Sequence, residues 1–249
     1  MQAALYKIRE RGKYGFINAA GTIIIEPQYL EANEFYNGFS SVKINNRFVP
    51  MDTVGRLYLK HFFNYVGLFE ERLARVQLVS RWGFIDERGN IEIPIQFDAA
   101  EDFSEGLAAV QINDKAGFIN TQGIYKIPPI YQKTWSFQHG IAAIQTEDKY
   151  GYIDKAGRWV TAPIFDFCLP FQGAVAAIIH NQKWGLIDRK GAILCAPQFE
   201  ILDLSDTGLF FEGRCRIAQK EPFGFIDEKG TVVVEPRYDS VGDYSEGLA

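Results

Sequence analysis

Basic side chains recur at one position of a repeated strand, and this recurrence offers the clearest binding chemistry in the sequence. Lys7, Arg75 and Arg216 each take the fourth position of the first strand expected in their repeat, and Arg214 stands close to Arg216. A guanidinium group can donate forked hydrogen bonds to a carboxylate or a phosphate. If the repeats close into a ring, these four residues line one sector of its channel. We therefore predict an anion or carboxylate-peptide site there; alternatively, the side chains extend into solvent or pair with acids.

An enlarged loop is the second candidate binding element. The repeat interval grows from 34 to 39 residues between the sixth and seventh repeats, and the extra residues fall within 200–209. This segment carries the polar side chains of Asp203, Ser205, Asp206 and Thr207. A long loop on a rigid scaffold is a common binding element, although a neutral surface loop would have the same sequence character.

Signatures of catalysis are absent from the sequence. It contains no G-x-G-x-x-G, G-x-x-x-x-G-K-[ST], H-E-x-x-H or G-x-S-x-G motif. His61, His139 and His180 stand where other repeats carry unrelated residues, which favours loop histidines over proton shuttles. We predict no catalytic residues, no metal site and no cofactor. An enzyme with a site at the channel mouth, built from Arg75, Arg216 and His180, is the alternative.

A second basic column stands two residues before each repeat centre. Its regularity favours a structural role at a hairpin shoulder over the steering of anionic partners. Its members are Lys13, Arg47, Arg81, Lys115, Lys149 and Lys183.

One unit that recurs along the whole chain positions these candidates. Its first copy runs from Lys13 to Gly21 around Gly15, and a worn copy lies around Val49. The other centres are Gly83, Gly117, Gly151, Gly185 and Gly224. The centres from residue 15 to residue 185 are 34 residues apart, which indicates an array of one supersecondary unit.

The composition of the unit indicates strands. Each copy carries glycines, usually a proline, and short β-branched or aromatic runs, and no helical period is sustained. In the fourth repeat we expect strands over 106–112, 116–120 and 124–127. Pro128 and Pro129 should end the third strand, because proline cannot donate to a ladder. The unit is therefore predicted to be a three-stranded antiparallel meander with room for a short fourth strand.

Every copy places an Asp or Asn three residues before a glycine, as in Asp86 with Gly89 and Asn120 with Gly123. An Asx side chain can cap a turn whose glycine is left-handed. We assign these acids to turns, because calcium needs roughly six to eight converging oxygens. The middle strand is apolar on both faces, so neighbouring sheets should cover both. We expect its central glycine to leave a slot for an aromatic ring of the neighbouring repeat.

The two ends of the sequence fall in the same strand of the repeat. Residues 244–249 match 103–108 and stop within a first strand, whereas residues 4–8 match a first strand. We predict an all-β fold of tandem three- to four-stranded antiparallel repeats, closed into a seven-bladed β-propeller-like ring and forming one domain over 1–249. The alternative is an open β-repeat array or solenoid.

The repeated phrase is basic-aromatic-Gly-aromatic-Ile-Asp/Asn-x-x-Gly, followed by a Pro-x-Tyr/Phe element such as 27–29 and by Ser-Glu-Gly-Leu-Ala at 104–108. It resembles the bacterial WG, or KWG, repeat over the whole chain. The second copy departs at 49–51, and the fourth has Ala116 in place of an aromatic residue. The resemblance implies a bacterial β-repeat module that has no shared catalytic residues and serves as an interaction domain.

Charge and hydropathy narrow the classes of partner. The chain has 249 residues and a net charge of −5, with Lys and Arg scattered, so nucleic acid is not expected to bind. No apolar segment resembles a signal peptide or a membrane span, so we predict a cytoplasmic location without membrane insertion. Three cysteines without a C-x-x-C pair fit a reducing compartment.

Dense structural repetition without a catalytic set favours a non-catalytic binding or scaffolding module. Its expected partner is a protein or peptide, with a surface polymer as a further possibility. The alternatives are the enzyme described above and a structural spacer within a longer repeat protein.

Overall fold

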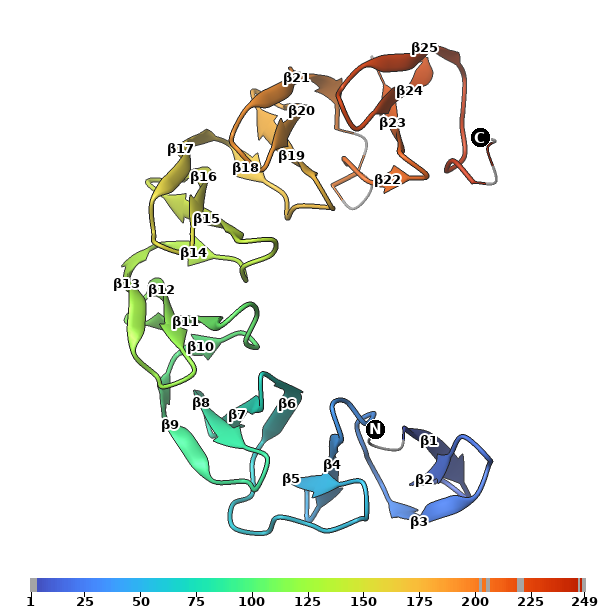
Figure 1. Cartoon of the computed structure of the whole chain (residues 1–249), viewed down its shortest axis with the longest axis vertical. Helices are drawn as coiled ribbons and strands as arrows, with labels where there is room; N and C mark the ends of the chain where they lie inside the picture. Colours follow the sequence, from blue (N-terminus) through green and yellow to red (C-terminus); the bar gives the residue numbers. More distant parts are fainter. Residues whose placement is uncertain (1–3, 202, 205–206, 219–221, 246, 248–249) are drawn as a thin grey trace. The chain divides into compact units, whose positions relative to one another are not determined.

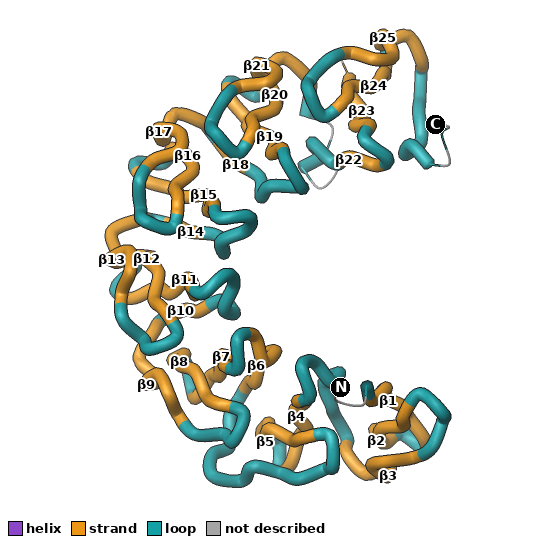
Figure 2. Tube along the Cα trace, viewed as in Figure 1, coloured by secondary structure: helices purple, strands orange, loops and turns teal. Residues whose placement is uncertain are grey.

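The fold is an array of small antiparallel sheets (Figure 1). A computed structural model describes residues 4–201, 203–204, 207–218, 222–245 and 247. Figure 2 shows strands and loops only, and no helix in the described part is long and apolar enough to cross a membrane. By its internal contacts the chain divides into two compact units, Met1–Ile130 and Tyr131–Ala249.

The first compact unit contains the first four sheets. The first two are β1 (Leu5–Glu10), β2 (Lys13–Asn18) and β3 (Ile23–Tyr29), then β4 (Phe39–Ile44) and β5 (Arg47–Asp52). The third is β6 (Tyr65–Glu70), β7 (Leu73–Leu78), β8 (Arg81–Asp86) and β9 (Ile91–Phe97). The fourth is β10 (Ala99–Ala100), β11 (Leu107–Ile112), β12 (Lys115–Asn120) and β13 (Tyr125–Tyr131), whose last residue belongs to the second unit.

The second compact unit contains the remaining three sheets. The fifth is β14 (Lys133–Thr134), β15 (Ile141–Thr146), β16 (Lys149–Asp154) and β17 (Trp159–Phe165). The sixth is β18 (Phe167–Cys168), β19 (Val175–His180), β20 (Lys183–Asp188) and β21 (Ile193–Glu200). The seventh is β22 (Phe210–Phe211), β23 (Arg214–Ala218), β24 (Phe223–Asp227) and β25 (Val232–Tyr238).

The predicted meander with a short fourth strand is therefore confirmed in the last four sheets. In every sheet a first strand and a middle strand form a hairpin, such as β7 with β8 in the third sheet, and in all but the second sheet a third strand follows. The third strands are β3, β9, β13, β17, β21 and β25. The tandem all-β array is confirmed, whereas its closure into a ring and its unity as one domain stay predictions.

The third strand does not end at its prolines, so that prediction is wrong. β13 continues through Pro128 and Pro129 to Tyr131. The equivalent pairing of β16 with β17 explains how: the ladder partners pass from Tyr152–Thr161 directly to Tyr150–Phe165. The intervening residues form a bulge, where a proline has no ladder bond to lose.

This bulge also accounts for the central glycine. A Cβ on Gly117 would lie 2.6 Å from the Ile127 oxygen and 2.7 Å from the Pro129 nitrogen. Gly15, Gly83, Gly151, Gly185 and Gly224 would meet the backbone of their own third strand in the same way. The predicted slot for a neighbouring aromatic ring is wrong, because the third strand of the same repeat fills that space.

The second repeat lacks both the central glycine and the bulged third strand. Val49, at the glycine position, is fully buried, and its Cβ would occupy the space that the bulge takes elsewhere. An irregular segment covers β5 instead, with the Phe48 amide donating to the Phe63 oxygen at 2.8 Å and the Tyr58 amide donating to the Pro50 oxygen at 3.0 Å. These bonds satisfy the edge of β5 without a regular strand.

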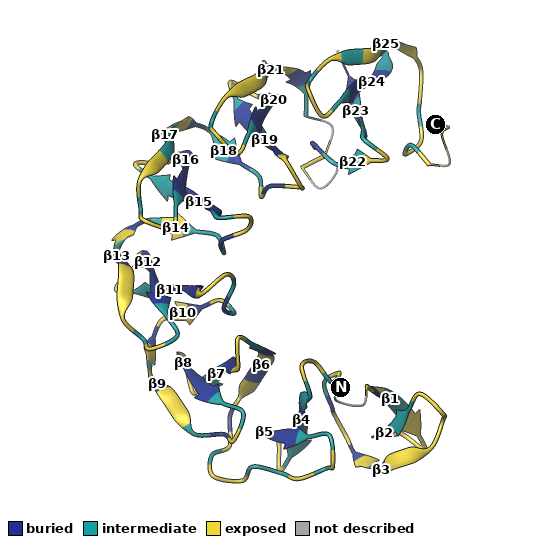
Figure 3. Ribbon diagram, viewed as in Figure 1, coloured by how far each residue is buried: buried dark blue, intermediate teal, exposed yellow. Residues whose placement is uncertain are grey.

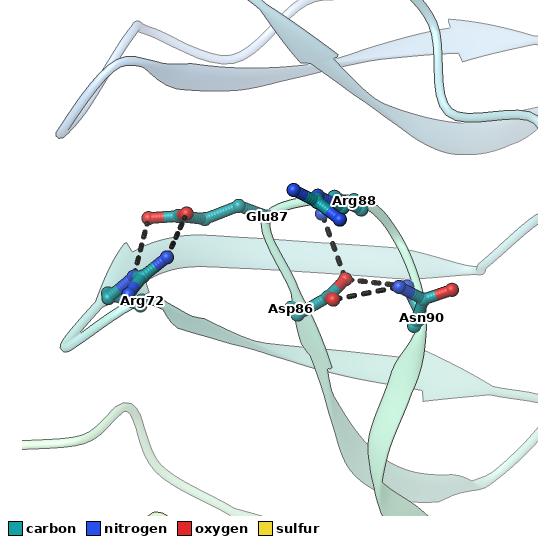
Figure 4. A network of polar contacts seen from close by, with 5 residues as sticks. All are labelled: Arg72, Asp86, Glu87, Arg88 and Asn90. Atoms are coloured by element: carbon teal, nitrogen blue, oxygen red, sulfur yellow. Dashed lines mark hydrogen bonds and ion pairs between the residues drawn. The ribbon is translucent and has the colours of Figure 1, made fainter.

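The Asp/Asn turns are confirmed in all seven repeats. Asp86 Oδ1 accepts the amides of Arg88 and Asn90, both at 2.8 Å, and Figure 4 shows this turn. Gly89 adopts φ 73°, and the equivalent glycines of the other six repeats also have positive φ. Each turn is thus capped by its Asx side chain and closed by a left-handed glycine.

Within each compact unit the core lies between successive sheets, as expected for middle strands with two apolar faces. Phe84, Ile93 and Phe97 of the third sheet share one buried cluster with Val110 and Ile119 of the fourth. In the second compact unit, Tyr152 and Phe165 pack with Ile178 and Ile187. Figure 3 shows buried middle strands and exposed third strands.

Candidate functional site

The guanidinium of Arg75, on β7 of the third sheet, is engaged by the segment that leads into the fourth sheet. Nη1 donates to the Ala100 oxygen at 2.8 Å and to Glu101 Oε2 at 2.9 Å, and Nε lies 3.0 Å from Asp102 Oδ1. The rings of Tyr65 and Trp82 flank the guanidinium at 5.6 and 5.5 Å. Burial raises the pKa of Asp102, against the opposing effect of Arg75. Arg75 is therefore already paired with the carboxylates of Glu101 and Asp102.

Lys7 and Arg216 follow the same pattern. Lys7 Nζ donates to the Ala32 oxygen at 3.2 Å and pairs with Glu34 at 3.0 Å, and Arg216 Nη1 donates to the Val241 oxygen at 3.3 Å. Each of the three basic residues reaches the carbonyl 25 residues further along the chain.

An acid also stands 27 residues after each of these bases. The pairs are Lys7 with Glu34, Arg75 with Asp102 and Arg216 with Asp243. The other four repeats carry Ser41, Ala109, Ala143 and Ala177 at the basic position, and no acid at the second. A basic residue in the first strand therefore recurs together with an acid in the connection that follows the third strand. The two form an ion pair in Lys7–Glu34 and in Arg75–Asp102.

Arg214 is the first residue of β23, an inner strand of the seventh sheet. Its Nη1 donates to the Gly213 oxygen at 3.1 Å, and its guanidinium lies 5.9 Å from the ring of Tyr244. Arg214, Arg216 and Asp243 line a cavity of only about 10 Å³. That volume is near the size of one water molecule, so the arrangement offers no room for a peptide carboxylate as it stands.

The structure places the enlarged loop only in part. Ser205 and Asp206 lie outside the described residues. Thr207 is buried, and its hydroxyl donates to the Asp203 oxygen at 2.6 Å. Thr207 thus serves the local fold of the loop and presents no free hydroxyl to a ligand.

Basic residues of the column that stands two residues before each repeat centre pair with acids. Lys149 pairs with Asp166 at 2.5 Å, and Arg81 pairs with Asp98 in the same geometry. The same carboxylates accept a backbone amide from the next hairpin at 2.7 Å: Asn181 donates to Asp166, and Asn113 donates to Asp98. Each of these two shoulder acids, Asp98 and Asp166, therefore joins two successive repeats.

His180 is part of this arrangement, because its Nδ1 lies 4.0 Å from Asp166. Lys149 and then the Asn181 amide hold the pKa of Asp166 below its usual value. Arg75 lies in the first compact unit, whereas Arg216 and His180 lie in the second. Each of the three side chains contacts groups within its own compact unit.

The three cysteines are buried free thiols. Burial raises the pKa of Cys215 to about 12 and that of Cys168 further still. Both therefore remain protonated at neutral pH, and a protonated thiol is a poor nucleophile and metal ligand. No group of three or more His, Cys, Asp or Glu side chains in the described part of the chain could hold a metal ion.

A polar cleft of about 330 Å³ lies over the Asp86 turn. Glu71, Arg72, Glu87 and Arg88 line it, together with Gln122 of the next turn. Figure 4 shows Arg72 paired with Glu87, where Nη2 lies 3.2 Å from Oε2. Glu71 accepts the Gly106 amide at 2.7 Å, so much of the lining already serves the fold.

A set of exposed apolar side chains recurs at the start of the third strands. We call these residues the third-strand apolar set, and their exposed fractions are 38–52%. The set consists of Ile23, Ile91, Tyr125, Trp159 and Ile193. Sequence reasoning missed it, although the 34-residue spacing within this set was visible. Edge strands often carry charged residues that discourage pairing, and the third-strand apolar set departs from that pattern.

Comparison with known families identifies the class of repeat. The family model described as "WG containing repeat" matches residues 14–48, 82–115, 117–150, 150–184 and 223–249. These segments make up more than half of the chain, which therefore belongs to this family. The unmatched segments contain Val49 and the enlarged loop, the two largest departures from the repeat.

The chain resembles solved structures in its fold and not in its sequence. The chain is similar to a structure described as "Crystal structure of the eukaryotic initiation factor", at a TM-score of 0.55 and 12% identity, over 95% of this chain and 74% of that one. It is also similar to Kluyveromyces lactis Hsv2, at a TM-score of 0.44 and 9% identity, over 75% and 71%. The first likeness supports a propeller-like all-β fold. No curated protein matches the sequence.

Proposed function

We propose that this chain is a non-catalytic binding module whose partner is a protein or peptide. The observation that carries the proposal is the third-strand apolar set. Its members share one repeat position, and each keeps 38–52% of its surface exposed. Apolar side chains and aromatic rings of this kind are frequent anchors of protein interfaces.

The charged candidates support a binding role over catalysis. Arg75 and Lys7 are held by carboxylates and carbonyl oxygens of the segments that lead into the next sheet, and Asp98 and Asp166 are held by arginine, lysine and backbone amides. A general acid or base needs a free reactive position beside its substrate. These residues act instead as connections between strands and between repeats.

The experiment is quantitative capture with two matched variants. One variant changes Ile23, Ile91, Trp159 and Ile193 to serine, and the control changes four other exposed apolar residues, Leu30, Val54, Leu59 and Ile130, to serine. Proteins retained from native-host lysate by each immobilised chain are quantified by mass spectrometry, and melting curves verify that both variants are folded.

We expect specific capture to fall by about tenfold or more in the first variant and to persist in the control, because anchors at a buried interface dominate affinity. Equal capture by the two folded variants would contradict the proposal. A proteome-wide absence of specific capture by the unmodified chain would contradict it as well.

A further inference from the structure

The hairpins that join first and middle strands share a left-handed turn. In six repeats the first turn residue has φ between 47° and 59°. These residues are Arg11, Asn45, Val79, Asn113, Glu147 and Asn181. Five of them are polar, and the sole β-branched residue among the six is Val79.

Val79 shares the left-handed φ of the other first turn residues and differs from them in its side chain. Its φ is 59°, in a region where a β-branched side chain crowds its own backbone. Its exposed fraction is 75%, so packing within this chain does not compensate for the strain. The adjacent Leu78 is also exposed, at 38%. The β7–β8 hairpin therefore ends in an aliphatic tip.

The base of this tip is anchored to the preceding repeat. Asn64 Oδ1 accepts the Val79 amide at 2.8 Å and also accepts a hydrogen bond from Arg47 Nη1. Both bonds converge on one oxygen and hold the turn in place. A side chain presented by a constrained backbone loses less freedom on binding than one on a free loop.

We infer that Leu78 and Val79 form a second contact of the binding module, inserting into an apolar pocket of a protein partner. Val79 is exposed, strained and aliphatic, at a position where other repeats carry polar turn formers. A contact residue retains such a combination at the expense of stability. A branched aliphatic knob fits a concave apolar pocket, and it does not fit a charged surface or a polar polymer. The inference rests on the proposed binding function.

Site-specific photocrosslinking tests this contact. An aliphatic diazirine amino acid is placed at position 79 of the full chain in native-host cells, and at position 113 as the matched hairpin control. Adducts are identified by mass spectrometry, and purified unmodified chain or the Val79→Asn variant is added to a lysate as competitor. Melting curves of Val79→Asn and of the reciprocal Asn113→Val are recorded in parallel.

We expect adducts with a specific protein at position 79 that are several-fold more abundant than at 113. The unmodified chain should compete them away, whereas Val79→Asn should need at least about tenfold more protein, the equivalent of about 1.4 kcal/mol. Val79→Asn should melt about 2–4 °C higher, and Asn113→Val should melt lower.

Three results would each overturn the inference: equal adducts at 79 and 113, equal competition by Val79→Asn, or no rise in its melting temperature. If the first occurs while the third-strand variant still loses capture, the second contact fails and the binding function stands. If that variant also keeps full capture, both fail.

Discussion

At the scale of single residues, the repeated glycine and the repeated acids are explained by close approach and by capping. The central glycine leaves room for the bulge of its own third strand, and the shoulder acid joins a basic side chain to the next hairpin. Each role depends on atoms from two segments of the chain. Such roles are visible only once the register of the strands is known.

The first prediction concerns the central glycine. Gly117→Ala should lower the free energy of unfolding by about 1–3 kcal/mol, because its Cβ would overlap backbone atoms of Ile127 and Pro129. Chemical denaturation measures the change. Gly242→Ala is the control, since a Cβ there meets nothing within 4 Å, and a change within about 0.5 kcal/mol is expected. Equal stability of the two variants would contradict the bulge account.

The second prediction concerns Asp166 and pH. Its folded pKa is depressed, so its charged form stabilises the fold above the unfolded value near about 3.9, and this stabilisation disappears as pH falls through the lower folded pKa. Asp166→Asn should therefore be less stable at pH 7, by under about 1 kcal/mol because the group is solvent-exposed. The difference should narrow below about pH 3.

Urea denaturation at both pH values measures this effect. Asp114→Asn provides the control, because this hairpin acid is exposed and tolerates either side chain in a left-handed turn. A stability loss for Asp166→Asn that is the same at pH 7 and pH 3 would rule out the charge-based explanation.

At the scale of elements, the sequence predicts first strands, middle strands and Asx turns correctly, because each recurs with a local pattern. The predicted third strand is too short, because it ends before Pro128 and Pro129. Proline is compatible with a strand end and with a bulge, and the partner strand determines which of the two forms. The acids 27 residues after Lys7 and Arg75 could have been found by comparing repeats. The exposure of the third-strand apolar set could not, because alternation alone does not say which face a neighbouring sheet covers.

The third prediction concerns the Asx turn as an element. Asn120 Oδ1 accepts the amides of Gln122 and Ile124 at 3.1 and 2.9 Å. Asn120→Ala should cost about 1 kcal/mol, whereas Asn120→Asp should be nearly neutral, because other repeats use aspartate with the same bonds. Thermal melts of the two variants check this. An aspartate variant as unstable as the alanine variant would contradict the capping role.

At the scale of the whole molecule, the fold is a set of similar sheets joined by repeated contacts, and membership of the WG repeat family agrees with this architecture. The glycine of the Asx turn contributes to stacking as well: a Cβ on Gly123 would lie 3.2 Å from Ile93 of the preceding repeat, and one on Gly191 would lie 2.5 Å from the Val160 oxygen. Because packing accounts for the buried positions of each repeat, we expect function to depend on the exposed exceptions.

The most direct test of the binding account is a hydrogen-exchange footprint with the captured partner. Amide exchange of the full chain is measured alone and with saturating partner. The account predicts slower exchange in β3, β9, β17 and β21, which carry four members of the third-strand apolar set, and in the β7–β8 hairpin. Protection confined to the segments around Arg75 and Arg214, with the third strands unchanged, would contradict it.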